Sequence, residues 1–156
     1  MPGIGGPRAV ITAALEALGD EGIVVEAVSP ILSTAPIGPS QRRYANAAAL
    51  VSSDLDPENL LSRAQTIERA LGRRRQGQRW RARPLDIDLI LWDGGVFLSG
   101  RLTIPHPAYS FRSFVLAPAA AIAPHWRDPF TGRTLRQLST RLTAPRPLPR
   151  ARTPIA

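Results

Sequence analysis

Two aspartates separated by a single residue are the strongest chemical signal in the chain. Asp86 and Asp88 lie within residues 85–92, where apolar and polar residues alternate as in a half-buried strand. Because strand side chains alternate between two faces, both carboxylates are expected on one face, with Cα atoms about 6.5–7 Å apart. Carboxylates this close raise each other's pKa unless a cation intervenes. The pair therefore predicts a Mg²⁺ site, since Mg²⁺ binds one or two carboxylates together with water and substrate phosphates.

The segment before these aspartates is strongly basic, with six arginines within residues 73–83. Arginine side chains beside a metal ion need an anion between the two positive groups, and a polyphosphate is such an anion. Metal on one side of a polyphosphate and guanidinium groups on the other is the arrangement that phosphoryl-type transfer requires. Two simpler hypotheses stay open from these residues alone: a solvated strand face paired with arginines, and a plain basic loop.

The composition favours a phosphate-rich partner and excludes several other chemistries. The 20 Lys plus Arg residues are all arginines, and against 12 Asp plus Glu they give a net charge of +8. An arginine-rich genome would explain this surplus equally well. Without lysine or cysteine, the chain has no Schiff-base lysine, thiolate nucleophile or disulfide. Neither a P-loop nor a Rossmann glycine motif is present, so phosphate binding must use other groups.

Length and hydropathy predict one soluble globular domain. The chain has 156 residues, of which 44% are hydrophobic, enough for one core. No apolar run approaches the ~20 residues that span a bilayer. The N-terminus lacks a signal-peptide pattern, which predicts a cytoplasmic protein.

The elements that position the aspartates follow an α+β order. Helices are predicted over residues 7–18, 57–72 (capped by Asp56), 107–123 (in one or two pieces, broken at Pro118) and 134–142. Strands are predicted over residues 23–29, 44–52 and 85–92, the last turning at Asp93-Gly94 into a second arm near 96–98. We expect a single domain over residues 1–143, followed by a disordered Pro/Arg-rich tail over 144–156.

The run Arg83-Pro84-Leu85-Asp86-Ile87-Asp88-Leu89-Ile90-Leu91 closely resembles the signature of the 6-hydroxymethyl-7,8-dihydropterin pyrophosphokinases, enzymes of folate biosynthesis. Blocks that resemble the family in order and spacing are residues 34–39, 44–47, 65–68 and 101–106. The resemblance covers about residues 7–129 and implies a ferredoxin-like antiparallel sheet with helices on one side, plus a C-terminal helical segment. The family's first strand has no counterpart before Pro7, so we expect a start placed too late or a truncated, inactive copy.

The resemblance implies transfer of diphosphate from ATP to the pterin hydroxymethyl group, with release of AMP. It implies two Mg²⁺ ions on Asp86 and Asp88, phosphate contact by Arg83, and a closing catalytic loop with Arg73. The implied ATP contacts are Gln65, Glu68, Trp80, Arg101, Thr103, His106 and Arg112. The implied pterin contacts are Thr34, Ala35, Ile37, Tyr44, Asn46 and Phe114. Pro107 stands where the family often has an aromatic residue, so one nucleotide contact is expected to differ.

Two hypotheses of other classes stay open. A single-stranded nucleic-acid binder would use the arginine-rich loop with Trp80 and would have no use for the two aspartates. A non-catalytic interaction domain would fit a truncated copy. As an enzyme, the chain is expected to bind small-molecule substrates, to need neither nucleic acid nor membrane, and to be a monomer.

Overall fold

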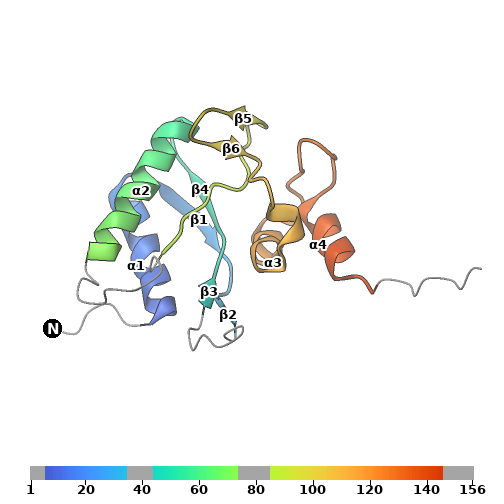
Figure 1. The fold of residues 1–156 in the computed structure, drawn as a ribbon, viewed down its shortest axis with the longest axis horizontal. Coiled ribbons are helices and arrows are strands. Elements are labelled where there is room, and N and C mark those ends of the chain that lie inside the picture. The colour runs from blue at the N-terminus through green and yellow to red at the C-terminus, as the bar shows by residue number, and fades with distance from the viewer. Residues whose placement is uncertain (1–5, 35–43, 74–84, 146–156) are drawn as a thin grey trace, which may run out of the picture.

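The computed structural model describes residues 6–34, 44–73 and 85–145, and these ranges form an α+β fold (Figure 1). The helices are α1 (Pro7–Asp20), α2 (Pro57–Arg73), the 3-10 turn η1 (Tyr109–Phe111), α3 (Ser113–Ile122) and α4 (Leu135–Thr143). The strands are β1 (Val24–Val28), β2 (Leu32–Thr34), β3 (Tyr44–Asn46), β4 (Ala49–Ser52), β5 (Phe97–Leu98) and β6 (Thr103–Ile104). The predicted α+β class is confirmed. The boundary between domain and tail at residue 143 stays a prediction.

The described strands pair as three antiparallel ladders, β1–β4, β2–β3 and β5–β6. The strand predicted over residues 44–52 is therefore two strands, and β3 and β4 have different partners. The break faces Pro30, which has no N–H to donate to a ladder. Ser29 holds the chain at the break, because its Oγ accepts from Ala48 N at 2.8 Å and its N donates to Ala48 O at 2.9 Å.

The predicted strand over residues 85–92 was wrong as a ladder element. Residues 85–91 have no strand partner in the described ranges, although exposure alternates from Leu85 to Asp88 as expected for an extended chain. The turn predicted at Asp93-Gly94 is present, since Trp92 and Gly95 on either side of it form a bridge and Gly95 has φ +95°. Beyond the turn, however, β5 pairs with β6 and not with residues 85–91. Alternation predicted the faces of this segment but not its hydrogen-bond partners.

The predicted helices are present, with corrected ends and one corrected break. α1 and α2 continue through the expected stop glycines, Gly19 and Gly72. Asp56 caps α2 as predicted, its Oδ1 accepting from Asn59 N at 2.8 Å. Pro118 lies inside α3, so the helix predicted to break at this residue continues through it. None of the helices in the described ranges combines the length and apolarity needed to span a membrane.

Two hydrophobic cores stabilise the described structure, and α1 with α2 lies at one end while α3 with α4 lies at the other (Figure 1). The first core is built on Val10, Ala14, Leu18, Ile23, Ile67 and Leu71. The second is built on Tyr109, Leu116, Leu135 and Leu138. Residues 85–91 contribute to both, because Leu85 and Ile87 pack on the first core while Ile90 and Leu91 pack on the second. The aspartate segment therefore joins the two cores.

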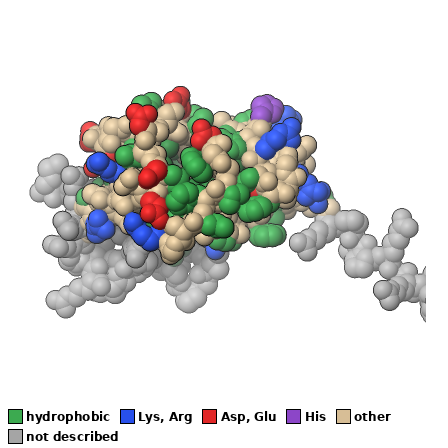
Figure 2. All heavy atoms as spheres, turned by 90° about the horizontal axis from the view of Figure 1, so that it is seen from above, with side chains coloured by type: hydrophobic (Ala, Val, Ile, Leu, Met, Phe, Trp, Pro, Cys, Tyr) green, Lys and Arg blue, Asp and Glu red, His purple; other side chains and the backbone are tan. Residues whose placement is uncertain are grey.

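Charge is unevenly distributed over the described surface. Figure 2 shows acidic side chains over the left and middle of one face, and a histidine with arginines at its right-hand end. That end is formed by α3 and α4, and residues 112–145 contain five arginines against one acid, the buried Asp128. A positive surface of this kind raises the local concentration of anionic ligands such as nucleotides.

Tyr109 should make the folded state less stable at alkaline pH. Burial, together with the nearby Asp128 carboxylate, raises the pKa of Tyr109 above its usual range. In the unfolded chain a tyrosine titrates near pH ~10, so above that pH the unfolded chain has lost a proton that the folded chain keeps. The free energy of unfolding should therefore fall as the pH rises from about 10 to 11.5. Urea unfolding of the wild type and Tyr109→Phe across this range measures the effect, and equal slopes for both proteins would contradict it.

Candidate active site

The two aspartates lie on the solvent side of the segment that joins the cores. Asp86 and Asp88 are exposed, whereas Ile87 between them is half-buried and packs on the first core. Within the described part of the chain, no hydrogen bond or ion pair engages either carboxylate, and no three His, Asp or Glu residues form a metal cluster. As far as the described residues go, both carboxylates are available to a ligand, which suits Mg²⁺ completed by phosphate and water.

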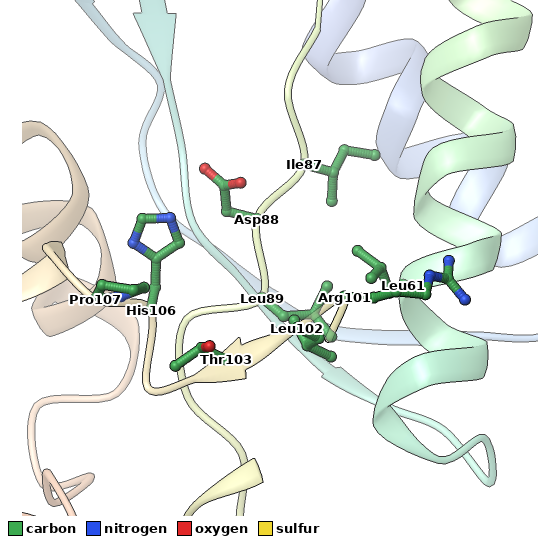
Figure 3. Close-up of a pocket in the computed structure, with 9 residues that line it drawn as sticks. All are labelled: Leu61, Ile87, Asp88, Leu89, Arg101, Leu102, Thr103, His106 and Pro107. Atoms are coloured by element: carbon green, nitrogen blue, oxygen red, sulfur yellow. The ribbon is translucent and has the colours of Figure 1, made fainter. Parts of the chain in front are cut away.

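Asp88 lines a cavity of about 300 Å³ together with three residues predicted to contact ATP, namely Arg101, Thr103 and His106 (Figure 3). Figure 3 shows Ile87 pointing towards the helices and Asp88 pointing the opposite way, on the same side as His106. Thr103 belongs to β6, and His106 follows two residues after that strand. The β5–β6 hairpin therefore brings the predicted nucleotide residues to the aspartate.

Arg101 and Gln65, both predicted to contact ATP, also contact each other. Arg101 Nη2 donates to Gln65 Oε1 at 3.1 Å and to Ser62 Oγ at 3.3 Å, both on α2. These bonds hold the exposed guanidinium against the helix while leaving several of its N–H donors for a ligand. Ser62 is a residue that sequence reasoning missed, although it lies three residues before Gln65 and so on the same helix face.

His106 combines a structural bond with an unused polar atom. Its backbone N donates to Ile90 O at 3.0 Å, which fixes the start of the loop after β6 against the aspartate segment. Its Nδ1 is buried and has no hydrogen-bond partner among the described residues. Since a buried polar atom without a partner is costly, this nitrogen calls for a hydrogen-bond partner that the described residues do not supply.

Glu68 does not line the cavity but bonds to Ile87, which does. Its Oε1 accepts from Ile87 N at 2.7 Å, in the backbone between the two aspartates. The resemblance implies an ATP contact for this residue, and that contact stays a prediction.

The predicted pterin residues lie on neighbouring elements. Tyr44 and Asn46 begin and end β3, which contacts α3, and Phe114 is the second residue of α3. Tyr44 is 49% exposed and Phe114 is 43% exposed, so both rings offer surface to a ligand. Arg112, a predicted ATP contact, occupies the N-cap position of α3. Its guanidinium carbon lies 6.0 Å from the centre of the Phe114 ring. None of these four lines the cavity of Figure 3; Tyr44 instead lines a second cavity of about 380 Å³ with Ser33.

Several predicted site residues cannot be placed. Ala35, Ile37, Trp80 and Arg83 lie outside the described residues, as does the arginine-rich loop on which the nucleic-acid hypothesis depends. Arg73 is the last residue of α2 and Thr34 is the last residue of β2. The cavity lining also includes Leu61, Ile87, Leu89, Leu102 and Pro107. Of these the sequence connected only Pro107 with nucleotide binding, as a departure from the family, and the apolar side chains of the other four gave no signal that would separate lining from core.

A profile of the 7,8-dihydro-6-hydroxymethylpterin-pyrophosphokinase (HPPK) family matches residues 3–124. The chain belongs to this family. Its resemblance to HPPK, expected from the segment around Asp86 and Asp88, is thereby confirmed. No comparison supports the nucleic-acid hypothesis.

Three HPPK relatives show how much of the chain is shared. The chain is 42% identical over 117 residues to the 2-amino-4-hydroxy-6-hydroxymethyldihydropteridine pyrophosphokinase of Synechocystis sp., covering 75% of this chain and 60% of that protein. It is 40% identical over 136 residues to the protein of the same name from Pseudomonas aeruginosa, covering 85% and 82%. It is 38% identical over 106 residues to a folate synthesis bifunctional protein of Arabidopsis thaliana, covering 67% and 22%. The chain thus matches less than two thirds of the length of the Synechocystis relative.

Proposed function

We propose that this chain transfers a diphosphate group from ATP to the hydroxymethyl group of 6-hydroxymethyl-7,8-dihydropterin. The acceptor oxygen forms a new bond to the β-phosphorus and loses its proton, while the bond from that phosphorus to the oxygen shared with the α-phosphate breaks. AMP leaves with the shared oxygen. The observation that carries the proposal is the cavity in which Asp88, Arg101, Thr103 and His106 meet. The Asp88 carboxylate suits a metal cation, and the Arg101 guanidinium and the His106 imidazole suit the nucleotide that carries the metal.

Asp86 and Asp88 are proposed to hold Mg²⁺, and two ions are expected from the family resemblance. Their exposure, and the lack of any other described group bonded to them, support this role. When bound, Mg²⁺ neutralises negative charge on the phosphates and so makes them more reactive.

The chain's own side chains are proposed to bind and orient the two substrates. Arg101 donates to nucleotide oxygens while Gln65 holds its guanidinium, and His106 uses its buried Nδ1 as a further polar contact. Tyr44 and Phe114 are proposed to flank the pterin ring, with Asn46 at its polar edge. From the family resemblance, Thr34, Ala35 and Ile37 add pterin contacts, and Thr103, Arg112, Glu68 and Trp80 add ATP contacts, while Arg73 and Arg83 act on the transferred phosphates.

An assay for AMP tests this function directly. The full chain is incubated with ATP and 6-hydroxymethyl-7,8-dihydropterin, with Mg²⁺ or with EDTA, and AMP is measured. AMP formation that needs both the pterin and Mg²⁺ is expected. Absence of pterin-dependent AMP would contradict the proposal, and tight, salt-dependent binding of single-stranded nucleic acid without turnover would favour the alternative.

Arg101→Ala should weaken nucleotide binding more than it slows the reaction. The Arg101 side chain lines the cavity and is held there by its bond to Gln65 on α2. Its removal would delete a charge-assisted hydrogen bond to ATP worth roughly 1.5–3 kcal/mol, or about ten- to a hundredfold in ATP affinity. Titration of a fluorescent ATP analogue measures this change. Arg69→Ala, on the same helix and outside the cavity, is the control. An unchanged affinity in Arg101→Ala would remove Arg101 from the nucleotide site.

A cytoplasmic location and a monomeric state, both expected from the sequence, are proposed together with this function. Gel filtration with light scattering measures the oligomeric state.

A further inference from the structure

The aspartate segment is extended, yet the part of the chain that the structure describes gives it no ladder to belong to. Residues 85–91 have no strand partner in the ranges that the structure describes. Backbone groups normally need hydrogen-bond partners, so an extended segment outside a sheet must find them elsewhere. Its shape therefore depends on individual bonds rather than on a repeating pattern.

Two bonds fix the backbone on either side of Asp88. Before it, Ile87 N donates to Glu68 Oε1 at 2.7 Å. After it, Ile90 O accepts from His106 N at 3.0 Å. The second bond joins backbone to backbone and does not depend on a side chain. The first depends entirely on one carboxylate, which makes Glu68 the side chain on which the local shape of the segment rests.

Glu68 is well placed to act as a rigid support. It lies on α2 next to Ile67, which is 3% exposed, and three residues before Leu71, which is 4% exposed. Ile87 packs on the same core as these two residues. The side chain of Ile87 and its N–H are thus held by the same stretch of helix, and the bond to an ionised acceptor is stronger than one between neutral groups.

We propose that Glu68 is a positioning residue that orients Asp86 and Asp88 for metal binding by holding the backbone N–H between them. This inference rests on the proposed function for its catalytic consequence. It differs from the ATP contact that the resemblance implies, because the group held by Glu68 belongs to the chain. Residues that orient metal ligands in this way typically change metal affinity or activity by about 10- to 100-fold when removed.

Three full-length variants test the role. Glu68→Ala removes the acceptor, Glu68→Gln keeps an acceptor oxygen without the charge, and Glu58→Ala makes the same truncation ten residues earlier on α2, about 15 Å away. Hydrogen exchange of the Ile87 amide is measured without nucleotide or metal. Mn²⁺ affinity is measured by electron paramagnetic resonance in the presence of α,β-methylene ATP, and the affinity for that analogue is measured in EDTA.

In Glu68→Ala we expect exchange at Ile87 and the Mn²⁺ dissociation constant to rise at least about tenfold. Because an ATP contact is also proposed for Glu68, the affinity for the analogue in EDTA gives the nucleotide part of the effect, and the Mn²⁺ dissociation constant should rise by more than that affinity falls. Glu68→Gln should restore most of the exchange protection because its carbonyl can accept the same bond. Glu58→Ala should match the wild type. Unchanged exchange in Glu68→Ala, or a loss confined to nucleotide affinity, would overturn the proposal.

These measurements also separate this inference from the proposed function. If the wild type forms no AMP, the proposed function fails, yet Ile87 exchange and Mn²⁺ affinity still decide whether Glu68 positions the aspartates. If the wild type is active and Glu68→Ala has normal exchange, only the positioning role fails.

Discussion

Asp88→Ala should lower AMP formation at least about a hundredfold while leaving the fold intact. Asp88 is the carboxylate that both belongs to the aspartate pair and lines the cavity with Arg101 and His106. Its loss removes a metal ligand at the position where phosphate charge must be neutralised. The side chain is exposed and bonds to no other described residue, so the free energy of unfolding should change by less than about 0.5 kcal/mol.

The measurement pairs the AMP assay with urea unfolding. Asp93→Ala is the matched control, because Asp93 is an exposed acid in the turn at the end of the same segment and does not line the cavity. The control should keep activity and stability. Near-normal AMP formation by Asp88→Ala would count against a metal role for the aspartate pair, whatever the outcome for Glu68.

Leu116→Ala should have the largest effect on stability. Leu116 is 0% exposed and lies in the second core with Leu135, Leu138 and Tyr109. Truncation of a fully buried leucine removes its contacts and leaves a cavity, which costs about 2–5 kcal/mol. Because Ile90 and Leu91 pack on the same core, the damage reaches the end of the aspartate segment.

Urea unfolding followed by circular dichroism measures the loss. Phe111→Ala is a fitting control, since Phe111 lies on the adjacent turn and is 78% exposed, and its truncation should change the free energy of unfolding by less than about 0.5 kcal/mol. A loss below about 1 kcal/mol in Leu116→Ala would mean that the second core collapses around the missing side chain.

Local patterns in the sequence predicted the helices well but the pairing of strands poorly. The predicted Asp56 cap is present, and the helix predicted over residues 134–142 begins with a capping box of Thr134 and Gln137 that the sequence analysis did not name. Caps depend on residues a few positions apart, so a single sequence contains their whole cause. Ladders depend on distant partners. Residues 85–91 alternate as a strand does, yet the bonds of their backbone go to a glutamate side chain and to the chain at His106.

The candidate site could be predicted in its residue types but not in its internal contacts. The spacing of Asp86 and Asp88 indicated one shared face, and both are exposed beside the packed Ile87. The family resemblance grouped Gln65 with Arg101 as nucleotide residues, but their mutual bond required the fold to bring α2 against the chain before β6. Glu68 shows the same limit, because its partner is a backbone group that no sequence motif records.

One stretch of extended chain lies between two packing units, and this has a consequence for engineering. Mutations that strengthen either hydrophobic cluster will also shift the acidic pair, because residues 85–91 are anchored in both. Stabilising substitutions are therefore best placed on surfaces remote from residues 85–91, such as the outward side of α4. Substitutions at Leu85, Ile87, Ile90 or Leu91 would therefore change stability and the geometry of the proposed metal site together.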